Sequence, residues 1–497
     1  MSRKKPIFYN ALLLTGVNLL LRFVGTSFQV FLSGKIGAAG IGLLQLVLSV
    51  GALSMTVGMG GIRTATMYLS AEAVGQQRND RITRILSGCI IYSLVLSCFV
   101  GALLYTFAPW IARIWIGDVT TIGAVRLLAS FLPVNCLCGV MVGYFTGVNR
   151  IGILAVVEVA EQLFSMAFTV LLLTFWAGSH VTRSCLSVIM GSGMGACFTL
   201  VTLLFLKRKE SSNVRERFPV WQKLWETAVP LAIADDVKAG ISTTENLMVP
   251  KRLALFPGES TPLATYGMVC GMVFPVLMFP TAILFGLAEL MIPELARCNA
   301  AGSITRIRHL SERSLLIALV YGCFCGGILF LSAENLCITL YSTPEAGQYL
   351  RLFSILAPML YCDAIVDAMT KGLGQQKICV RNNIITSAMD VVMLFILLPR
   401  YGMSGYFFSF LVTHLVNFLL SIRLLRKMVG KLQSTKTVIL CALAVICSVS
   451  AAQIVNTTIG RCIAFSILLP TMLTLLGILG KADLQWFSGL LLPRISE

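Results

Sequence analysis

Charged residues are scarce in this sequence. Of its 497 residues only 12% are charged, whereas 57% are hydrophobic, and the 22 acidic residues are outnumbered by 39 lysines and arginines. So little polar surface cannot cover a soluble body of this length. The composition therefore excludes an ordinary soluble globular protein and predicts a protein that is embedded in lipid.

The sequence also lacks the patterns of a metal site or a disulfide framework. It has only three histidines, and its 16 cysteines are scattered through apolar stretches, as at Cys136 and Cys138. A free cysteine in such a stretch behaves as a small hydrophobic residue, and a single intervening residue does not match the spacing of zinc ligands. We therefore expect neither a metal nor any other cofactor.

A nucleotide-binding loop is missing as well. The nearest approach is Gly480-Lys481, but Ala482 follows the lysine, and the glycine that a P-loop needs five residues before Gly480 is absent. No cluster of acids of the kind that an integral glycosyltransferase uses stands in a loop. The sequence thus predicts a transporter rather than an enzyme, and a membrane scaffold or integral enzyme is the least favoured class.

Long apolar runs, in contrast, are abundant. A spanning helix needs about 20 mostly apolar residues, and such stretches recur along the chain with short polar breaks between them. They are too long and too continuously apolar for the strands of a membrane barrel, so the predicted fold class is all-α. About fourteen transmembrane helices are expected, at residues 7–32, 41–69, 85–108, 122–147, 151–176, 184–206, 222–250, 263–292, 314–341, 347–370, 380–399, 403–424, 437–457 and 461–480.

The basic residues sort by side of the membrane. A net charge of +17 is compatible with nucleic-acid binding, but most lysines and arginines stand at the N-terminus, after even-numbered helices and near the C-terminus. The positive-inside rule then places both chain ends in the cytoplasm, and the bacterial cytoplasmic membrane is the expected location. The dense group from Lys207 to Lys223 is expected to be a linker that touches anionic lipid headgroups. No nucleic-acid partner is predicted.

An internal repeat indicates two lobes. The run Ile82–Ile85 after the second helix recurs as Ile304–Ile307 after the eighth, and Gly147 recurs near the same spacing as Gly372. Six helices separate the copies, so the two halves are expected to be parallel and related by an axis along the membrane normal. The predicted parts are an N-lobe at 1–206 with helices 1 to 6, a basic cytoplasmic linker at 207–222, a C-lobe at 223–430 with helices 7 to 12, and helices 13 and 14 with a tail at 431–497.

Four stretches carry a family likeness that extends over nearly the whole chain. They resemble the stage V sporulation protein B family, and they lie at Glu245–Leu253, Tyr266–Pro280, Gly372–Gln376 and Leu398–Tyr406. That family is part of the multidrug, oligosaccharidyl-lipid and polysaccharide exporter superfamily, which also includes lipid II flippases. The resemblance implies that the chain flips a lipid-linked peptidoglycan precursor for the spore cortex by alternating access. A cation-coupled multidrug antiporter of the same architecture is the alternative.

A lipid-pyrophosphate-linked glycan precursor would need cations within the membrane. A charge in a transmembrane helix is costly and therefore marks a functional candidate. Arg22 in the first helix and Lys238 in the seventh lie at similar depth and could clamp a diphosphate, and Arg63 in the second helix is the third substrate-binding candidate. Arg22 and Gly25 match the arginine and the glycine of the motif that the family resemblance implies for the first helix. The alternatives are helix packing for Arg22, an interfacial position for Arg63, and a pair with Asp235 for Lys238.

Acidic side chains form the second candidate set, as sites for a coupling ion or for gating. They are Asp235, Asp236, Glu245, Asp363, Asp367 and Asp390. Asn383, Thr386 and Asp390 share one helical face, and their oxygen atoms suit a hard cation such as sodium. The favoured interpretation of these groups is cross-helix hydrogen bonding inside the bundle, and a sodium ion or proton site between Asp236 and Asp390 is the alternative. His414 is expected to be a polar packing residue.

Overall fold

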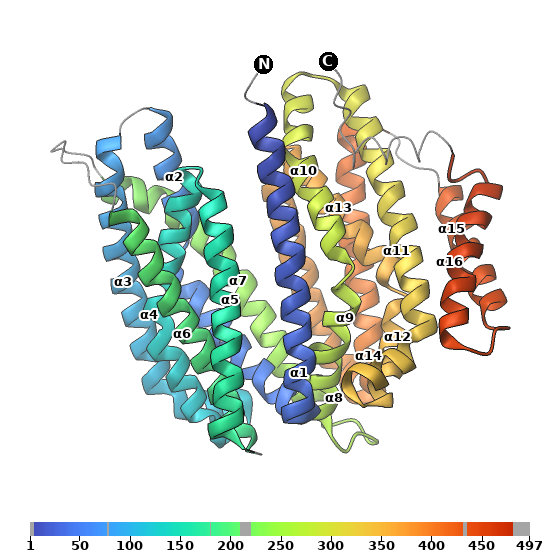
Figure 1. Ribbon diagram of the computed structural model, residues 1–497, viewed down its shortest axis with the longest axis horizontal. Helices are drawn as coiled ribbons and strands as arrows, with labels where there is room; N and C mark the ends of the chain where they lie inside the picture. The colour runs from blue at the N-terminus through green and yellow to red at the C-terminus, as the bar shows by residue number, and fades with distance from the viewer. Residues whose placement is uncertain (1–3, 77–78, 179, 209–219, 431–434, 481–497) are drawn as a thin grey trace. The chain divides into compact units, whose positions relative to one another are not determined.

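The computed structural model describes residues 4–76, 79–178, 180–208, 220–430 and 435–480. Within these residues every regular element is a helix, which confirms the predicted all-α fold class (Figure 1). Contacts divide the chain into two compact units. The first unit is Met1–Gly271 with Ser387–Met403, and the second is Met272–Thr386 with Ser404–Glu497. The seventh expected helix belongs to the first unit, and the lobe boundaries given above stay a prediction.

The first unit contains eight helices of its own and part of a ninth among the described residues. They are α1 (Lys4–Met59), α2 (Ile62–Gly75), α3 (Asn79–Trp110), α4 (Ile122–Gly147), α5 (Ile151–Leu172), α6 (Val181–Arg208), α7 (Val220–Leu253), α8 (Pro262–Met268) and the middle of α14 (Gln376–Val429). Two π-helical segments, Ile111–Ile116 and Leu173–Ala177, extend α3 and α5. A third, Val269–Val273, continues α8 into the second unit.

The second unit holds the remaining helices. They are α9 (Phe274–Met278), α10 (Thr281–Ala300), α11 (Ile304–Tyr341), α12 (Pro344–Ser354), α13 (Ala357–Gly372), the two ends of α14, α15 (Thr435–Ala452) and α16 (Thr458–Leu475). Helices α15 and α16 form an antiparallel pair that packs on α11 (Figure 1). Phe465 of α16 fills the space that a side chain at Gly327 would occupy, with its Cζ only 2.1 Å from the position of a Cβ.

Two of the helices each contain two spans. Gly37 inside α1 has φ 69° and ψ 176°, and Gly402 inside α14 has φ 57° and ψ −139°. A positive φ is routine only for glycine, so these residues turn the chain at the expected breaks between helices 1 and 2 and between helices 11 and 12. Proline marks two further bends: the expected eighth helix bends by 58° beside Pro280, and the expected tenth bends by 57° just before Pro358.

The described helices account for the expected spans. Eight helices are long and apolar enough to cross a membrane, and the two bent pairs raise this number to ten. The second halves of α1 and α14 add two spans, and the remaining two are α7, which carries more charge, and the shorter α15. These fourteen segments confirm the predicted class of multi-pass helical membrane protein.

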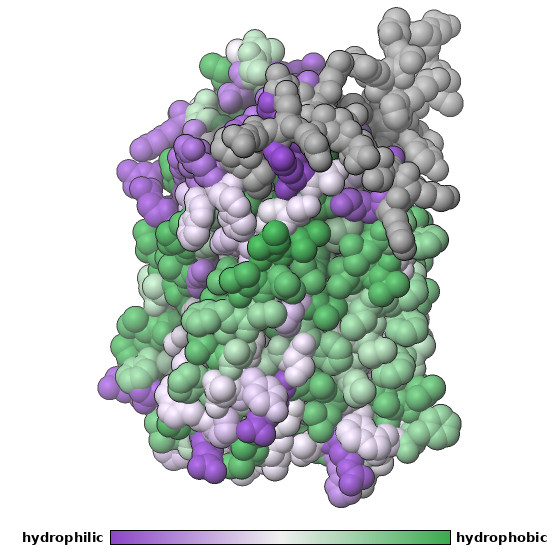
Figure 2. Space-filling model, turned by 90° about the vertical axis from the view of Figure 1, so that its left-hand side faces the viewer, coloured by the Kyte–Doolittle hydropathy of each residue, from purple (hydrophilic) through white to green (hydrophobic). Residues whose placement is uncertain are grey.

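The outer surface of the helices suits a bilayer. Figure 2 shows one face on which apolar residues form a band between polar ends. Exposed apolar side chains recur along α3 at Ile91, Val95 and Phe99, and along α6 at Val201 and Phe205. Because lipid rather than water covers such a band, the exposed hydrophobic area is the normal surface of a spanning helix.

Small residues let the helices of the first unit approach closely. A Cβ added to Gly143 of α4 would lie 2.3 Å from the carbonyl oxygen of Arg63, and one added to Gly147 would lie 2.6 Å from that of Met67. Tyr144 and Phe145, between these glycines, are buried in the apolar core of the unit. Close backbone approach at small residues is the usual way in which helices associate within a membrane.

The predicted repeat is visible in two turns. In the turns 147–150 and 372–375 the residue after the glycine has nearly the same backbone angles, φ −84° and ψ 9° at Val148 and φ −85° and ψ 8° at Leu373. The next residue has a positive φ in both, 60° and 78°. The three N–H groups that follow the glycine donate to carbonyls four, three and five residues earlier in each turn. The local fold is therefore repeated after α4 and after α13.

Candidate substrate and coupling-ion sites

Arg22 lies in the membrane-spanning part of α1 and is half-buried. The side-chain amide of Gln162, on α5, donates to the carbonyl oxygen of Leu21 at 3.1 Å. It can reach this oxygen because position 25 is glycine: a Cβ there would lie 3.2 Å from the Gln162 Nε2 atom. The arginine and glycine of the first-helix motif thus belong to one arrangement, in which α5 fixes the backbone beside Arg22.

Two carboxylates occupy the same face of α5 as Gln162. Glu161 accepts a hydrogen bond of 2.7 Å from the Thr199 hydroxyl of α6, and Glu158 interacts electrostatically with Glu161 and with Arg63 of α2. The Arg63 side chain is exposed, whereas both glutamates are half-buried. Arg63 therefore has an acidic neighbour within its own unit, which offsets part of its attraction for an anionic cargo.

The charged residues in the middle of α7 do not neutralise one another. Asp235 and Lys238 are both exposed, and no ion pair joins these two described side chains. Asp236 is half-buried, faces Tyr92 of α3 and has a buried Oδ1 atom without a hydrogen-bond partner. Lys238 is thus free of the pairing that was its alternative explanation, and its place opposite Arg22 stays a prediction.

Asp390 of α14 is buried, with an exposed fraction of 7%, and its carboxyl neighbour is Glu245 of α7. The two carboxyl groups lie within hydrogen-bonding reach of each other inside the first unit. Next to Glu245, Asn246 accepts a hydrogen bond of 3.2 Å from the buried Tyr266 hydroxyl. Two adjacent carboxylates in a medium of low dielectric cannot both stay ionised without a cation, so this pair can hold a proton or a sodium ion.

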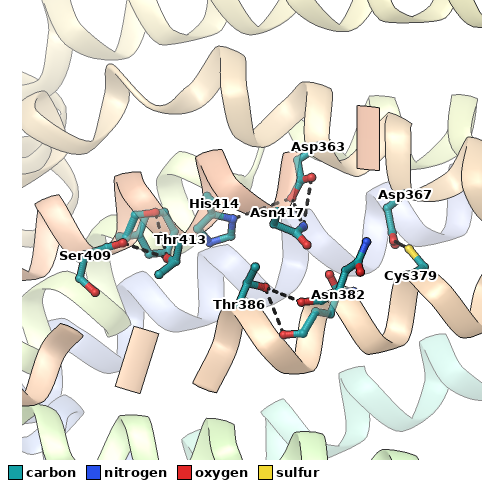
Figure 3. A network of polar contacts seen from close by, with 11 residues as sticks. Asp363, Asp367, Cys379, Asn382, Thr386, Ser409, Thr413, His414 and Asn417 are labelled. Atoms are coloured by element: carbon teal, nitrogen blue, oxygen red, sulfur yellow. Dashed lines mark hydrogen bonds and ion pairs between the residues drawn. The ribbon is translucent and has the colours of Figure 1, made fainter. Parts of the chain in front are cut away.

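The second unit contains a network of polar contacts that joins α13 to both ends of α14 (Figure 3). The Asn417 side-chain amide donates to both carboxylate oxygens of Asp363, at 3.2 and 3.1 Å. The Nδ1 atom of His414 lies 3.8 Å from Asp363 Oδ2. Buried atoms without a hydrogen-bond partner remain here, namely His414 Nδ1 and Asn417 Oδ1. The network therefore has unused capacity to bind a proton or a cation.

Asp367 and Thr386, also in this network, are satisfied by near neighbours. Asp367 forms an ion pair of 2.5 Å with Lys371, one turn further along α13, and accepts a hydrogen bond from the Cys379 thiol. The Thr386 hydroxyl donates to the backbone carbonyls of Asn382 and Asn383 in its own helix. These contacts indicate structural roles for both residues.

A mostly apolar pocket of about 600 Å³ with two cationic residues lies in the first unit, at the C-terminal end of α7. Its lining includes Trp115, Thr244, Lys251 and Arg252. The Lys251 ammonium group donates to the backbone carbonyl of the residue before Trp115. The guanidinium of Arg252 lies 3.2 Å from the ring centre of Phe395 in α14. Sequence reasoning missed this pocket, because its residues come from three separate segments.

An apolar pocket of about 560 Å³ lies in the second unit, between α11, the α12–α13 bend and α15. Its walls include Phe330, Ile355, Pro358 and Val445, together with the thiols of Cys323 and Cys441. The size and lining suit part of an apolar chain rather than a sugar.

The side chains that sequence reasoning missed are those whose partners lie far away in the chain. Gln162 shares a helical face with Glu158 and Glu161, and this spacing was a usable signal of a third polar contact. Asn417 stands three residues after His414 on α14, so the two side chains share a face toward Asp363. Only the structure identifies the carboxylate that they both approach.

Known proteins resemble this chain in sequence and in fold. Over 415 residues it is 21% identical to stage V sporulation protein B of Bacillus subtilis (strain 168), covering 81% of this chain and 80% of the relative. The lipid II flippase MurJ, in an inward closed conformation, superposes with a TM-score of 0.70 at 10% identity, over 93% of this chain and 98% of that chain. A multidrug resistance MATE family transporter of the MOP superfamily gives a TM-score of 0.63 at 14% identity, over 84% and 98%.

The chain is similar in sequence to stage V sporulation protein B and shares its fold with a MOP-superfamily transporter. No family model matches it. The similarity agrees with the resemblance seen in the sequence motifs, and the bent helices and the repeated turns belong to a fold that transporters use. The chain is therefore a multi-pass membrane protein whose fold is shared with solved transporters.

Proposed function

We propose that this chain moves a lipid-linked glycan precursor of the peptidoglycan class across the bacterial cytoplasmic membrane by alternating access. Relatives of two kinds support the proposal, the stage V sporulation protein B to which it is similar in sequence and the lipid II flippase to which it is similar in fold. The likeness to the sporulation protein supports a role in the synthesis of the spore cortex. The function needs no catalytic residue, since the cargo crosses unchanged.

The observation that carries this proposal is the position of Arg22. A half-buried arginine within a membrane-spanning helix is expensive unless it meets an anion or a wet cavity. Gln162 and Gly25 hold the backbone beside it in place, and such fixing is typical of a binding residue. A guanidinium can bind a diphosphate through two parallel hydrogen bonds. Arg22 is therefore assigned to the pyrophosphate, with Lys238 and Arg63 as secondary cations.

The two pockets support the same cargo. The pocket with Lys251, Arg252 and Trp115 offers positive charge and an aromatic surface to an anionic sugar head. The apolar pocket beside α15 matches the other end of the molecule, a long hydrocarbon tail. A lipid-linked glycan carries both kinds of surface, which a small water-soluble substrate does not.

The buried acids favour one alternative, a cation-coupled multidrug antiporter. Glu245 with Asp390 and Asp363 with Asn417 place carboxyl groups inside both units, and the fold is shared with a multidrug resistance transporter. In the flippase proposed here, these acids bind the coupling ion, a proton or sodium, instead of the cargo. Asp235 and Asp236 are then gating residues on α7.

The proposed topology places both chain ends in the cytoplasm. The basic segment 207–223 would then face the anionic headgroups of the inner leaflet. Most of that segment, 209–219, lies outside the described residues. A reporter at Ser211 is expected to be cytoplasmic, and one at Ser260 on the opposite side.

A reconstituted assay tests the function. The purified full-length protein is placed in liposomes with a fluorescent lipid-pyrophosphate disaccharide, the matching lipid monophosphate without sugar, or a cationic dye. We expect flipping of the first substrate well above protein-free liposomes. Transport of the dye alone, driven by an ion gradient, would support the antiporter instead.

A further inference from the structure

The expected eighth span is not one continuous helix but passes through α8, α9 and α10 (Figure 1). Residues 269–273, between α8 and α9, are π-helical, and the chain bends by 58° across the break between Met278 and Thr281. Pro275 and Pro280 lie in this stretch, and neither has an N–H group to donate. Carbonyl oxygens that lose their helical donors inside a membrane need donors from elsewhere in the protein.

Side chains from other helices donate to carbonyls of this stretch. In a continuous α-helix the Gly271 carbonyl would accept from residue 275, which is proline. It accepts a hydrogen bond of 3.0 Å from the side-chain amide of Gln29, on α1. The Leu277 carbonyl, beside the break, accepts one of 2.8 Å from the buried hydroxyl of Tyr361, on α13. These two bonds replace helical bonds that the irregular backbone does not make.

Two tyrosines of α11 donate to the same stretch. The Tyr341 hydroxyl donates to the Met272 carbonyl at 3.2 Å, and the Tyr321 hydroxyl donates to the Pro280 carbonyl at 3.0 Å. Tyr341 is buried and Tyr321 is half-buried. Because a buried carbonyl that loses its donor costs free energy, each of these hydroxyls stabilises the bent conformation.

The irregular stretch is also where the chain passes from the first unit to the second. The boundary falls between Gly271 and Met272. The donor to the Gly271 carbonyl, Gln29, belongs to the first unit, whereas the donor to the Met272 carbonyl, Tyr341, belongs to the second. Two successive carbonyls are therefore held by side chains of different units.

The regular helices on either side of this stretch are packed closely within their own units. In the first unit, a Cβ added to Gly267 of α8 would lie 2.0 Å from the carbonyl oxygen of Ala38 in α1. In the second unit, a Cβ added to Gly372 of α13 would lie 3.0 Å from the carbonyl oxygen of Ile292 in α10. Because α8 and α10 are each fixed in this way, a movement of one against the other has to occur in the residues between them.

We propose that residues 271–280 form a hinge in the eighth span, and that Tyr321, Tyr341 and Tyr361 are positioning residues that hold this hinge in the conformation seen here. The inference rests on the alternating access proposed above and names a place where the backbone bends. The prolines have already removed helical hydrogen bonds that a change of bend would otherwise have to break. A tyrosine hydroxyl can release its carbonyl by a small side-chain movement, which leaves the helices on either side intact.

Amide hydrogen exchange of the full-length protein in lipid nanodiscs tests the hinge without any cargo. Tyr361→Phe and Tyr321→Phe each remove one hydroxyl and keep the ring. Each should raise exchange across residues 277–283 about two- to tenfold, the effect of losing one neutral hydrogen bond. Tyr401→Phe, which removes an exposed hydroxyl, should leave exchange there unchanged. Unchanged exchange in the two hinge variants would overturn the proposal, and the half-buried Tyr321 keeps the test decisive if Tyr361→Phe does not fold.

Flipping measurements separate a positioning role from a purely structural one. In both hinge variants the maximal flipping rate of the lipid-pyrophosphate disaccharide should fall about two- to tenfold, because the conformation seen here is less readily regained. The half-saturating substrate concentration should stay at its wild-type value. Lower thermal stability with an unchanged maximal rate per folded molecule would overturn the hinge. If the wild type moves no lipid-linked substrate, the proposed function fails, while raised exchange in the variants still supports the hinge.

Discussion

The first and second units each contain a turn of the same backbone conformation, but the helices that follow the two turns make different contacts. After the turn 147–150, α5 directs Gln162 outward to the backbone of α1 and Glu161 to α6. After the matching turn 372–375, the polar Thr386 of α14 bonds only to its own helix. The comparison teaches that the two units repeat a backbone conformation but differ in their side-chain chemistry. The first unit holds the backbone beside Arg22 in place, and the second brings His414 close to Asp363.

Substitution of Arg22 is expected to give the largest effect and tests the chemistry assigned to the first unit. Arg22→Ala should lower the flipping rate at least about tenfold, because a charge-assisted hydrogen bond contributes about 1.5–3 kcal/mol and each 1.4 kcal/mol is a factor of ten. Arg22→Lys should keep part of the activity, since charge remains while the planar fork is lost. Flipping assays at matched protein levels in the membrane measure both.

The matched control for Arg22 is Arg183→Ala, which removes an exposed arginine from the first turn of α6. It should leave transport unchanged. Equal rates for the wild type and Arg22→Ala would mean that α1 packs at this position and binds no substrate.

Close helix contact in the first unit predicts the next largest effect. Gly143→Ala should destabilise the protein by about 1–3 kcal/mol, because the new methyl group would meet the Arg63 carbonyl 2.3 Å away and the backbone must shift. Gly152→Ala is the control, since nothing lies within 4 Å of its Cβ position. Thermal unfolding in detergent measures the difference, and equal stability of the two variants would contradict the close approach of α2 and α4.

Gln162→Leu tests whether α5 positions Arg22. The change removes one hydrogen bond to the Leu21 carbonyl, worth about 1 kcal/mol, and should reduce flipping several-fold with little loss of expression. Gln222→Leu, which removes an exposed glutamine from α7, should have no effect on transport. If both variants transport at the wild-type rate, the fixed geometry of Arg22 is not needed.

The repeated turns give the smallest predicted effect. Gly374 has φ 78° and Asn149 has φ 60° at corresponding positions. Gly374→Asn should be tolerated because asparagine adopts this conformation readily, whereas Gly374→Val should cost about 1–2 kcal/mol. The unfolding temperatures of the two variants measure this difference, and equal values would show that the turns do not constrain the chain alike.

Much of the fold could be predicted from the sequence, because the length of each apolar run and the charges beside it determine where a membrane-spanning helix begins and ends. The breaks near Gly37 and Gly402 follow from glycines between apolar runs, and Pro280 marks a bend. The partners of individual side chains could not be predicted in the same way. The contact between Asp390 and Glu245 could not be read from the sequence, since the rotation of α7 against α14 depends on all their packing at once, and a site between Asp236 and Asp390 stays a prediction.

The candidate site shows the same limit. The motif around Arg22 was enough to select this arginine as a candidate. The hydrogen bond from Gln162 to the neighbouring Leu21 carbonyl could not be predicted, because it depends on which face α5 turns toward α1. His414 was read as a packing residue because a lone histidine in an apolar helix usually is one. His414 and Asp363 are far apart in the sequence, so no local sequence pattern predicts that their side chains lie close together.

Two cysteines in the wall of the apolar pocket beside α15 can report when that pocket opens to water. Cys323 and Cys441 line it and are almost fully shielded, with exposed fractions of 5% and 1%. A thiol reacts as its thiolate, which does not form in dry surroundings, so both cysteines stay inert while the helices around them remain packed. Because protein atoms shield both sulfur atoms, their alkylation requires these helices to separate, and the rate of their modification reports how often the walls of the pocket open to water.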